Sequence, residues 1–505
     1  MEKMGKYIIK STAGVYEGHR MESGVVEFLG IPYCKKPERW KKAEPPEPSD
    51  KLFKAESYSP VCYQHVFREE WERTPKMSED CLALNIWMAD NDKKKKSVMV
   101  WIHGGSYYTG AAHIDCFNGV YCGDKFVEAN PDIIFVNFNY RLNVFGMLDL
   151  SSIDEKGEYE DSVNLTITDQ IMALRWVHEN IGAFGGDAEN ITVFGQSAGG
   201  GSVSTLCCIP EANKYFQKAI IQSAGISDRT IRYRNDAKKV GEIIIKKLNV
   251  KSMEEMLAVS PEKLTEVAAR YFDEAGGNNT VPFDPTWGVG NMPEDPLENV
   301  RKGAAGHLTI MTGSTSGEYN SWVAGMTTEE IRDMAKEASA GRLTDDMIEA
   351  FMNNDESRSE RDSMIELHMD LLLRGCQICT LEALIKGGSK AFNYYISCVP
   401  DGAKYKPQHC FEIPYIMGKP MNYIYLDINS SEPCQGKNPI MELVGKLQGC
   451  WANFARYGNP NGSHMNTEWE PYTLENHETL VIDRNTMLVN GVRDKDMDIV
   501  RCLHR

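Results

Sequence analysis

The stretch Asn190-Ile-Thr-Val-Phe-Gly-Gln-Ser-Ala-Gly-Gly200 organises the rest of the chain. Residues 191–194 form a short apolar run that predicts a buried strand, and the small residues from Ala198 onward are compatible with a helix. Between them, residues 195–199 match G-x-S-x-G, which places its serine on a sharp strand-to-helix turn. In a chain with 42 glycines the bare pattern also arises by chance. The flanking strand and helix favour the turn, with Ser197 exposed as a nucleophile.

Composition restricts the classes of partner. The 505 residues carry a net charge of −17, which argues against nucleic acid or an anionic membrane surface as the main partner. The N-terminal residues have no apolar leader, and no run approaches the roughly 18 apolar residues of a membrane span. We therefore expect a soluble, cytoplasmic protein, or a secreted one if its start has been trimmed. A monomer or small homo-oligomer is expected.

Cysteine spacing does not predict a metal site. The chain has 14 cysteines, and Cys376 and Cys379 form a C-x-x-C pair without a second pair to complete a zinc site. We expect neither a metal nor an organic cofactor.

The order of predicted elements indicates an α/β architecture. Two N-terminal strands are predicted at residues 7–16 and 24–31, joined by a polar turn around 17–21. Later strands are predicted at 81–87, 98–102, 132–137, 218–222, 308–312 and 391–396, with a helix at 168–180. This pattern predicts a large, mostly parallel sheet with an antiparallel N-terminal edge.

Two charged helical segments, about 229–267 and 327–384, are predicted as insertions that cover the active-site end of the sheet. Their helices begin with the capping signals Ser252 with Glu255 and Thr327 with Glu330. We find no break in composition, so one domain is predicted over residues 1–505.

A serine hydroxyl needs a base and a carboxylate that orients the base. His409 lies in an irregular segment after the strand predicted at 391–396, where an α/β hydrolase places its base. In that fold the chain order is serine, acid, histidine. Glu318 follows the small residues after the strand at 308–312 and is the predicted acid. Alternatively, Glu318 is a helix-start carboxylate and His409 an ordinary loop histidine.

Backbone N–H donors are also required, because an oxyanion forms during acyl transfer. The segment His103-Gly-Gly-Ser106 follows a predicted strand and is small enough for its backbone to approach a substrate. Ala198, directly after the nucleophile, supplies a further N–H. A glycine-rich loop could instead hold phosphate, but neither the P-loop nor the dinucleotide-binding pattern is present.

Motifs spread over nearly the whole chain resemble the type-B carboxylesterases, including the bacterial p-nitrobenzyl esterase group. They are Gly30-Ile-Pro-Tyr33, Glu79-Asp-Cys-Leu-Ala-Leu-Asn-Ile86, His103-Gly-Gly105, Asn139-Tyr-Arg-Leu142, Asp169-Gln170, Phe184-Gly-Gly-Asp187, 195–200, 451–460 and Trp469-Glu-Pro-Tyr472. The resemblance implies an α/β-hydrolase fold with Ser197 as nucleophile, Glu318 as acid and His409 as base. It also implies Gly105, Ser106 and Ala198 as the oxyanion-hole donors.

The resemblance implies further pairings. Arg39 with Glu79 and Arg141 with Asp169 are implied as structural ion pairs. Cys62 and Cys81 match the family's first disulfide, but a cytoplasmic location would keep both thiols reduced. Whether the two cysteines form a disulfide is therefore left open.

Three positions depart from the family pattern. Ser106 stands where a third glycine is usual, and since only its N–H is used, a small residue should serve. Gln196 replaces the usual glutamate before the serine, and the missing charge is expected to shift the pH optimum. Tyr319 follows Glu318 where glycine is common, so substrate access is expected to differ.

Trp287, Tyr319 and Trp322 are predicted pocket walls or core residues.

Together these features predict a serine hydrolase that cleaves small to medium uncharged carboxylic esters through an acyl-enzyme, with the ester and water as its only partners. One alternative is a non-catalytic relative that uses the same fold for binding. Another is a hydrolase with the same triad that acts on amides, thioesters or lactones.

Overall fold

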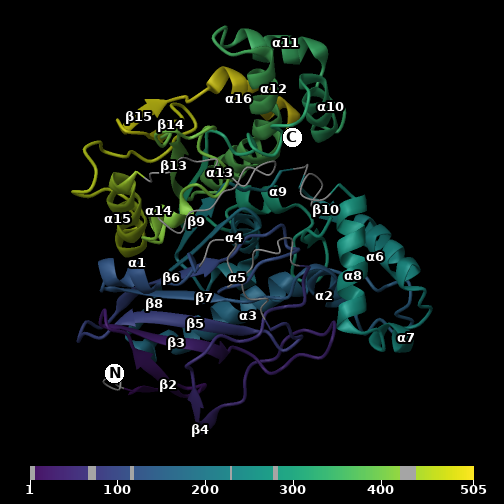
Figure 1. Ribbon diagram of the computed structural model, residues 1–505, viewed down its shortest axis with the longest axis vertical. Helices are drawn as coiled ribbons and strands as arrows, with labels where there is room; N and C mark the ends of the chain where they lie inside the picture. Colours follow the sequence, from purple (N-terminus) through teal and green to yellow (C-terminus); the bar gives the residue numbers. More distant parts are fainter. Residues whose placement is uncertain are drawn as a thin grey trace. The chain divides into compact units, whose positions relative to one another are not determined.

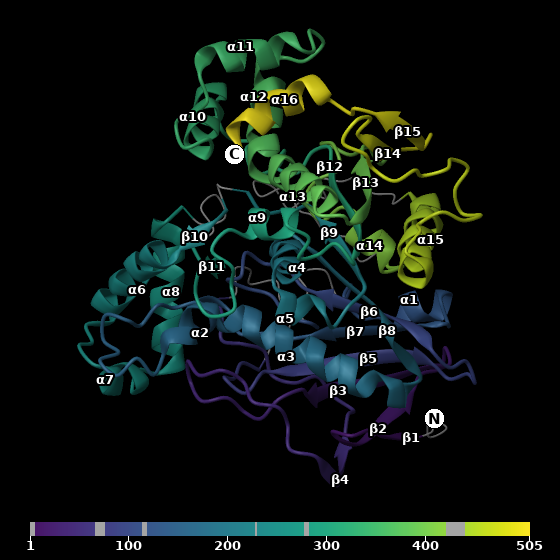
Figure 2. The ribbon, with the colours of Figure 1, turned by 180° about the vertical axis from the view of Figure 1, so that it is seen from behind.

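The computed structural model describes residues 6–65, 76–113, 119–227, 230–276, 282–420 and 440–504. The chain divides into two compact units, and each is described by itself. Unit 1 comprises residues 1–193, 208–217 and 232–296, and unit 2 comprises residues 194–207, 218–231 and 297–505. Figure 1 labels the elements, and Figure 2 shows the same ribbon from behind.

Unit 1 carries the N-terminal strands of a mixed sheet. They are β1 (Lys6–Lys10), β2 (Gly14–Arg20), β3 (Val25–Pro32), β4 (Ser49–Lys54), β5 (Ala83–Ala89), β6 (Lys96–Ile102), β7 (Ile133–Phe138) and β8 (Gly186–Gln196), whose last three residues belong to unit 2. Their order is β1-β2-β3-β5-β7-β6-β8, and β4 pairs with β2. The pairs from β1 to β7 along this order are antiparallel, whereas β6 and β7 are parallel. The predicted antiparallel N-terminal edge is therefore confirmed.

The prediction of one continuous strand over residues 7–16 is wrong, because a turn divides this stretch into β1 and β2. The Ser11 N–H donates to the Gly14 carbonyl at 2.8 Å, and the Ser11 hydroxyl accepts from the Ala13 N–H at 3.1 Å, which closes a turn between β1 and β2. The predicted turn around 17–21 is mostly strand, since Glu17 is buried in β2 and forms an ion pair with Lys6. The reversal comes later, where the Met21 N–H donates to the Val25 carbonyl.

The helices of unit 1 are short, apart from α3 and the first insertion. They are α1 (Asp124–Ala129), α2 (Asn143–Gly146), α3 (Leu165–Asn180), α5 (Pro210–Asn213), α6 (Arg234–Leu248), α7 (Met253–Leu257) and α8 (Pro261–Glu274), with 3-10 turns at Glu160–Asn164 and Ile181–Phe184. Two short strands, β10 (Arg232–Tyr233) and β11 (Thr286–Trp287), pair in parallel.

The first predicted insertion corresponds to α6–α8, which extend beyond residue 267 to Glu274; Arg229, at its predicted start, lies outside the described residues. α6 lies against α8, as Figures 1 and 2 both show. The Ser252 cap is confirmed, since its hydroxyl accepts from the Glu255 N–H at 3.2 Å.

Unit 2 contains a run of parallel strands. They are β9 (Lys218–Gln222), β12 (Thr309–Thr315), β13 (Lys390–Ile396), β14 (Glu478–Ile482) and β15 (Met487–Asn490), in that order. The pairs β9–β12, β12–β13 and β13–β14 are parallel, as predicted for this half of the chain, and β14–β15 is antiparallel. The sequence analysis did not predict β14 and β15. Because neighbouring parallel strands end at the same edge, the segments after β9, β12 and β13 meet there.

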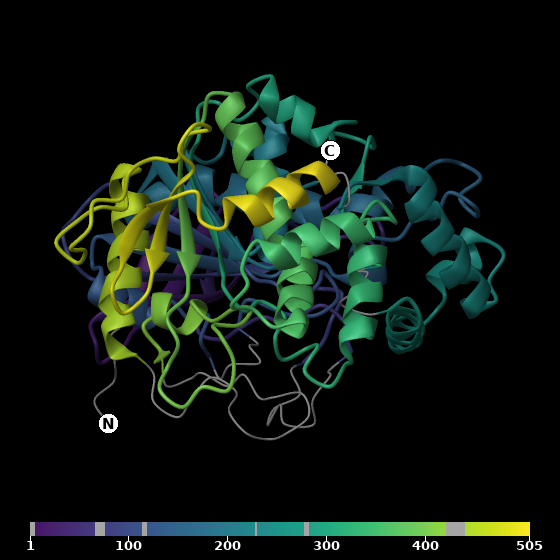
Figure 3. The same ribbon diagram turned by 90° about the horizontal axis from the view of Figure 1, so that it is seen from above.

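The helices of unit 2 include α10–α13, which fall in the second segment predicted as helical. They are α4 (Ala198–Cys208), α9 (Pro296–Arg301), α10 (Thr328–Ala338), α11 (Asp345–Asn353), α12 (Glu360–Met369), a π-helical turn (Asp370–Arg374), α13 (Gly375–Lys386), α14 (Ile413–Ile416), α15 (Met441–Tyr457) and α16 (Asp494–Leu503). The capping box is confirmed: the Thr327 N–H donates to the Glu330 carboxylate at 2.7 Å. In Figure 3 the yellow helix α16 lies against the green helices of this insertion, in agreement with its contacts to α11 and α13.

Candidate active site

The segment around Ser197 has the predicted strand–turn–helix form. β8 ends at Gln196, Ser197 has a left-handed φ of 60°, and α4 begins at Ala198. The turn is fixed in unit 2, because the Ser197 N–H donates to the Gln222 carbonyl of β9 at 3.0 Å. A Cβ on Gly200 would lie 2.7 Å from that carbonyl oxygen, so the close approach of α4 to β9 requires glycine.

Glu318 and His409, which are 91 residues apart in the sequence, are brought together in unit 2. Oε2 of Glu318 lies 2.5 Å from Nδ1 of His409, and both side chains are buried. The other carboxylate oxygen, Oε1, accepts from the Thr315 N–H and from the Ser223 hydroxyl, each at 2.7 Å. Short hydrogen bonds to an ionised carboxylate are among the strong ones in proteins. The Glu318 carboxylate is therefore held by two donors at one oxygen while its other oxygen contacts the His409 imidazole.

The backbone also joins the segment that carries Glu318 to the one that carries His409. The His409 N–H donates to the Glu318 carbonyl at 3.2 Å, and the Gly317 N–H donates to the Pro407 carbonyl at 2.9 Å. The distance between acid and base thus depends on main-chain hydrogen bonds as well as on side chains.

Two aromatic rings face the imidazole of His409. The Tyr319 ring is nearly parallel to it, with centroids 6.2 Å apart, and Trp322 lies 5.8 Å away. The structure therefore places these two residues beside His409, and whether they line a substrate pocket stays a prediction. Aromatic faces attract cations, so both rings can stabilise an imidazolium. Trp287 belongs to unit 1, where it is buried in β11.

A second buried carboxylate, Glu412, was missed by the sequence analysis. Its Oε1 accepts from the side-chain Nε2 of Gln222 at 2.9 Å, and the side-chain Oε1 of Gln222 in turn accepts from the Trp451 indole N–H at 3.2 Å. No hydrogen-bond partner of Oε2 is found among the described residues. Burial, with a smaller contribution from the charge of Glu318, raises the pKa of Glu412 to about 7. The available signal was a lone acid in the apolar run Cys410-Phe-Glu-Ile.

The three expected oxyanion donors fall in different units. In unit 1, Gly105 and Ser106 have left-handed φ angles of 115° and 56°. A Cβ on Gly105 would come 2.1 Å from the Thr109 carbonyl oxygen, so this position requires glycine. In unit 2, Ala198 is the first residue of α4. Their common role as N–H donors stays a prediction.

The two implied ion pairs are present in unit 1. Arg141 donates to Asp169 from Nε at 2.8 Å and from Nη2 at 2.7 Å, and both residues are buried. Arg39 donates from Nε to Glu79 at 2.8 Å and is part-buried. The first pair joins a loop to helix α3, and the second joins two loops of unit 1.

Cys62 and Cys81 are free and buried in the structure. A hydrogen bond with Cys62, together with burial, raises the pKa of Cys81. A buried, protonated thiol is a poor nucleophile, so Cys81 is unreactive in the reduced state.

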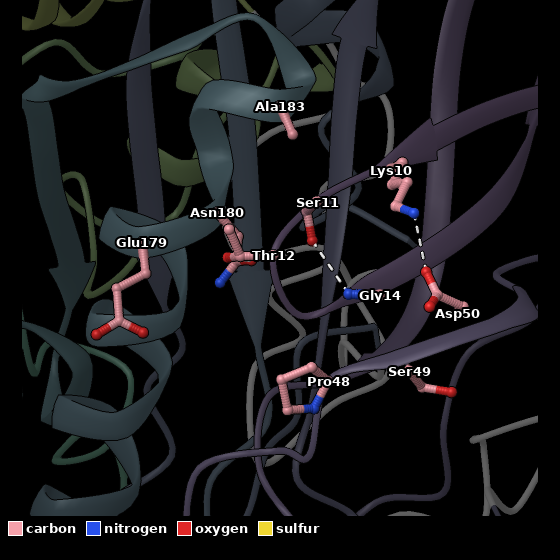
Figure 4. A pocket seen from close by; sticks show the side chains of 10 residues that line it. All are labelled: Lys10, Ser11, Thr12, Gly14, Pro48, Ser49, Asp50, Glu179, Asn180 and Ala183. Carbon is pink, nitrogen blue, oxygen red and sulfur yellow. Dashed lines mark hydrogen bonds and ion pairs between the residues drawn. The ribbon is translucent and has the colours of Figure 1, made fainter.

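A surface hollow of unit 1, about 530 Å³ in volume, is shown in Figure 4. Its polar side chains are already paired: Lys10 binds Asp50 at 2.8 Å, and Thr12 donates to Asn180 at 2.9 Å. It contains none of the predicted site residues. Within the described part of the chain, no helix is both long enough and apolar enough to span a membrane.

The order of the strands and helices, with a serine on the turn after β8, defines the class of protein as an α/β hydrolase. Comparison with known proteins then gives the family. The model of the carboxylesterase family matches residues 8–500. The chain is 32% identical over 499 residues to the para-nitrobenzyl esterase of Bacillus subtilis (strain 168), covering 96% of this chain and 97% of that protein. It is 27% identical to the acetylcholinesterase of Leptinotarsa decemlineata, covering 96% and 83% of the two chains.

Solved structures agree. A thermophilic PNB esterase matches with a TM-score of 0.84 at 28% identity, covering 98% of this chain and 99% of the other. A carboxylesterase of Geobacillus stearothermophilus matches with a TM-score of 0.83 at 28% identity, covering 97% and 99%. The chain belongs to the carboxylesterase family, and the resemblance inferred from its motifs is confirmed. It is therefore an enzyme, a serine carboxylesterase.

Proposed function

We propose that the protein hydrolyses small to medium uncharged carboxylic esters through a triad of Ser197, His409 and Glu318. The observation that carries the proposal is the buried contact of 2.5 Å between Glu318 Oε2 and His409 Nδ1, with Ser197 on a strained turn in the same unit. Strain of this kind collects at functional sites. The names of the relatives, para-nitrobenzyl esterase among them, support an ester as the substrate.

In the proposed reaction, Oγ of Ser197 attacks the ester carbonyl carbon while its proton passes to Nε2 of His409. Glu318 stabilises the resulting imidazolium through Nδ1–H. The N–H groups of Gly105, Ser106 and Ala198 are the proposed donors to the oxyanion. Collapse of the tetrahedral intermediate breaks the bond to the alcohol, which takes the proton from Nε2. Water then repeats these steps and releases the acid. The proposed unit of function is one catalytic domain, residues 1–505.

The test is Ser197→Ala with p-nitrophenyl acetate and butyrate. We expect kcat to fall by at least about 1000-fold, because a triad loses most of its rate when the nucleophile is removed. Ser204→Ala, on the same helix, is the matched control and should retain activity. If Ser197→Ala turns over at the wild-type rate, the mechanism is wrong.

Two alternatives are separated by simple measurements. A protein that uses this fold only for binding would be folded but would not react with a fluorophosphonate, whereas the proposed enzyme is labelled stoichiometrically at Ser197. A preference for amides, thioesters or lactones would appear as a higher kcat/KM when matched substrates compete.

A further inference from the structure

The side chain of Gln196 connects two residues of the segment that carries the proposed base. Gln196 ends β8, directly before Ser197, and only 1% of it is exposed. Its amide Nε2 lies 3.2 Å from Nε2 of His409. Its carbonyl Oε1 accepts from the Cys410 thiol at 2.8 Å. Both polar ends of one carboxamide therefore contact consecutive residues, all within unit 2.

The contact with His409 fixes the position of the ring proton. A carboxamide nitrogen can donate but cannot accept, so Nε2 of His409 must be the acceptor. The single proton of the neutral ring then lies on Nδ1, where Oε2 of Glu318 accepts it at 2.5 Å. This tautomer is the one that the proposed general base needs, because Nε2 then carries the lone pair that takes the proton of Ser197.

Cys410 determines which way the carboxamide is turned. With the amide reversed, its oxygen would face the lone pair of Nε2 and its NH2 group would face the thiol. The thiol donating to Oε1 favours the orientation observed. Cys410 holds this position with a left-handed φ of 68°, a conformation that is unfavourable for a residue with a Cβ. Such strain persists where the surrounding structure makes use of it.

We propose that Gln196 and Cys410 are positioning residues that fix the tautomer and the orientation of the His409 ring. The inference rests on the proposed function. When Nε2 takes the proton of Ser197, it becomes a donor facing the NH2 group of Gln196. Two opposed donors disfavour the imidazolium and favour transfer of its proton to the leaving alcohol. A glutamate at this position would instead accept from the imidazolium and stabilise it.

Other titratable groups also surround His409, and the experiment must separate their effects on the pH profile from the effect of Gln196. They are Glu318 after β12, Glu412 at the start of α14, Cys410, Tyr319 and, beyond Tyr319, His368 of α12. Burial raises the pKa of Glu412 to about 7, so each pH profile is repeated in a Glu412→Gln background.

The first measurement is kcat/KM for p-nitrophenyl butyrate between about pH 5 and 9, followed at the isosbestic wavelength of the product. Gln196→Glu should move the acidic limb of the profile upward by about 1 pH unit, in both backgrounds. Gln196→Leu should lower kcat about tenfold with KM within about twofold, since it removes orientation rather than substrate binding. If Gln196→Glu does not shift the acidic limb of the pH profile, the inference is overturned.

The second measurement tests whether Cys410 acts through Gln196. Cys410→Ala should lower kcat roughly threefold, and Cys410→Ser, which keeps a donor, should restore it. In the Gln196→Leu background, Cys410→Ala should have no further effect, because coupled residues are not additive. Cys450→Ala, another buried cysteine of unit 2, is the control for lost volume. If Cys410→Ala lowers kcat as much in the Gln196→Leu background as in the wild-type protein, the coupling between Cys410 and Gln196 is refuted.

Failure of the proposed function would look different. If wild-type protein neither reacts with a fluorophosphonate at Ser197 nor hydrolyses the ester, the triad proposal fails. If it does both, and the two measurements above give the overturning results, only the roles of Gln196 and Cys410 fail.

Discussion

Replacing Glu412 by glutamine should change how stability depends on pH. The wild-type carboxyl is buried, its Oε2 has no hydrogen-bond partner among the described residues, and its pKa is raised from 4.5 to about 7 by burial, with a smaller contribution from Glu318. Below about pH 4.5 the group is protonated in both the folded and the unfolded chain. Its ionisation therefore does not lower the free energy of unfolding in this range. As the pH rises from 4.5 to 7, the unfolded chain loses this proton while the folded chain keeps it, so the free energy of unfolding falls. Above pH 7 the full cost is present.

The size of the effect follows from the pKa. Each pKa unit is worth about 1.4 kcal/mol, so the rise at Glu412 corresponds to roughly 3 kcal/mol. In Glu412→Gln the amide oxygen can keep the hydrogen bond from Gln222, but the new NH2 group adds buried donors, which cost about 1–3 kcal/mol at every pH. The difference between variant and wild type should therefore shift by about 3 kcal/mol in favour of the variant between pH 4.5 and 8.

The assay is urea unfolding followed by tryptophan fluorescence at several pH values between about 4.5 and 8. Glu337→Gln, at an exposed position of α10, is the matched control and should show no pH-dependent difference from wild type. If the difference between Glu412→Gln and wild type is the same at pH 4.5 and 8, to within about 0.5 kcal/mol, Glu412 does not titrate in this range and the reasoning fails.

Two further substitutions test contacts around the acid and in unit 1. Ser223→Ala removes a hydrogen bond of 2.7 Å to Glu318, so kcat should fall about tenfold with KM little changed; equal activity in a steady-state assay would mean that the Thr315 N–H alone holds the acid. Asp169→Asn leaves the Arg141 guanidinium buried without its counter-charge and should lower the free energy of unfolding by about 3–5 kcal/mol. A loss below about 1 kcal/mol in urea unfolding would contradict that estimate.

The sequence predicted the elements whose signals are local. β9 has the predicted bounds, and α10 begins at the predicted cap, Thr327. The first strand was mispredicted because an apolar run does not show that the Ser11 hydroxyl closes a turn inside it. β14 and β15 were missed although most of their residues are apolar or β-branched. Pairing partners far along the chain decide whether such a run becomes a strand.

The site was predictable to the extent that it depends on residue type and order. Chain order singled out Glu318 and His409, but it could not say that Gln196 would donate to the same ring nitrogen that the serine needs. Sequence analysis noted Gln196 only as a missing charge. The role of Cys410 depends on a left-handed φ and on a thiol direction, and neither has a signal in the order of residues.

The main-chain hydrogen bonds between the segments of Glu318 and His409 affect which parts of the chain can change in length during evolution. They close a loop of about 90 residues that contains α10–α13, and both ends of that loop are fixed by hydrogen bonds close to the proposed reacting groups. Doubling the length of a flexible loop adds only about 0.6 kcal/mol of closure entropy. Helices between Thr328 and Lys386 can therefore be lengthened, shortened or exchanged by insertion and deletion while acid and base keep their spacing.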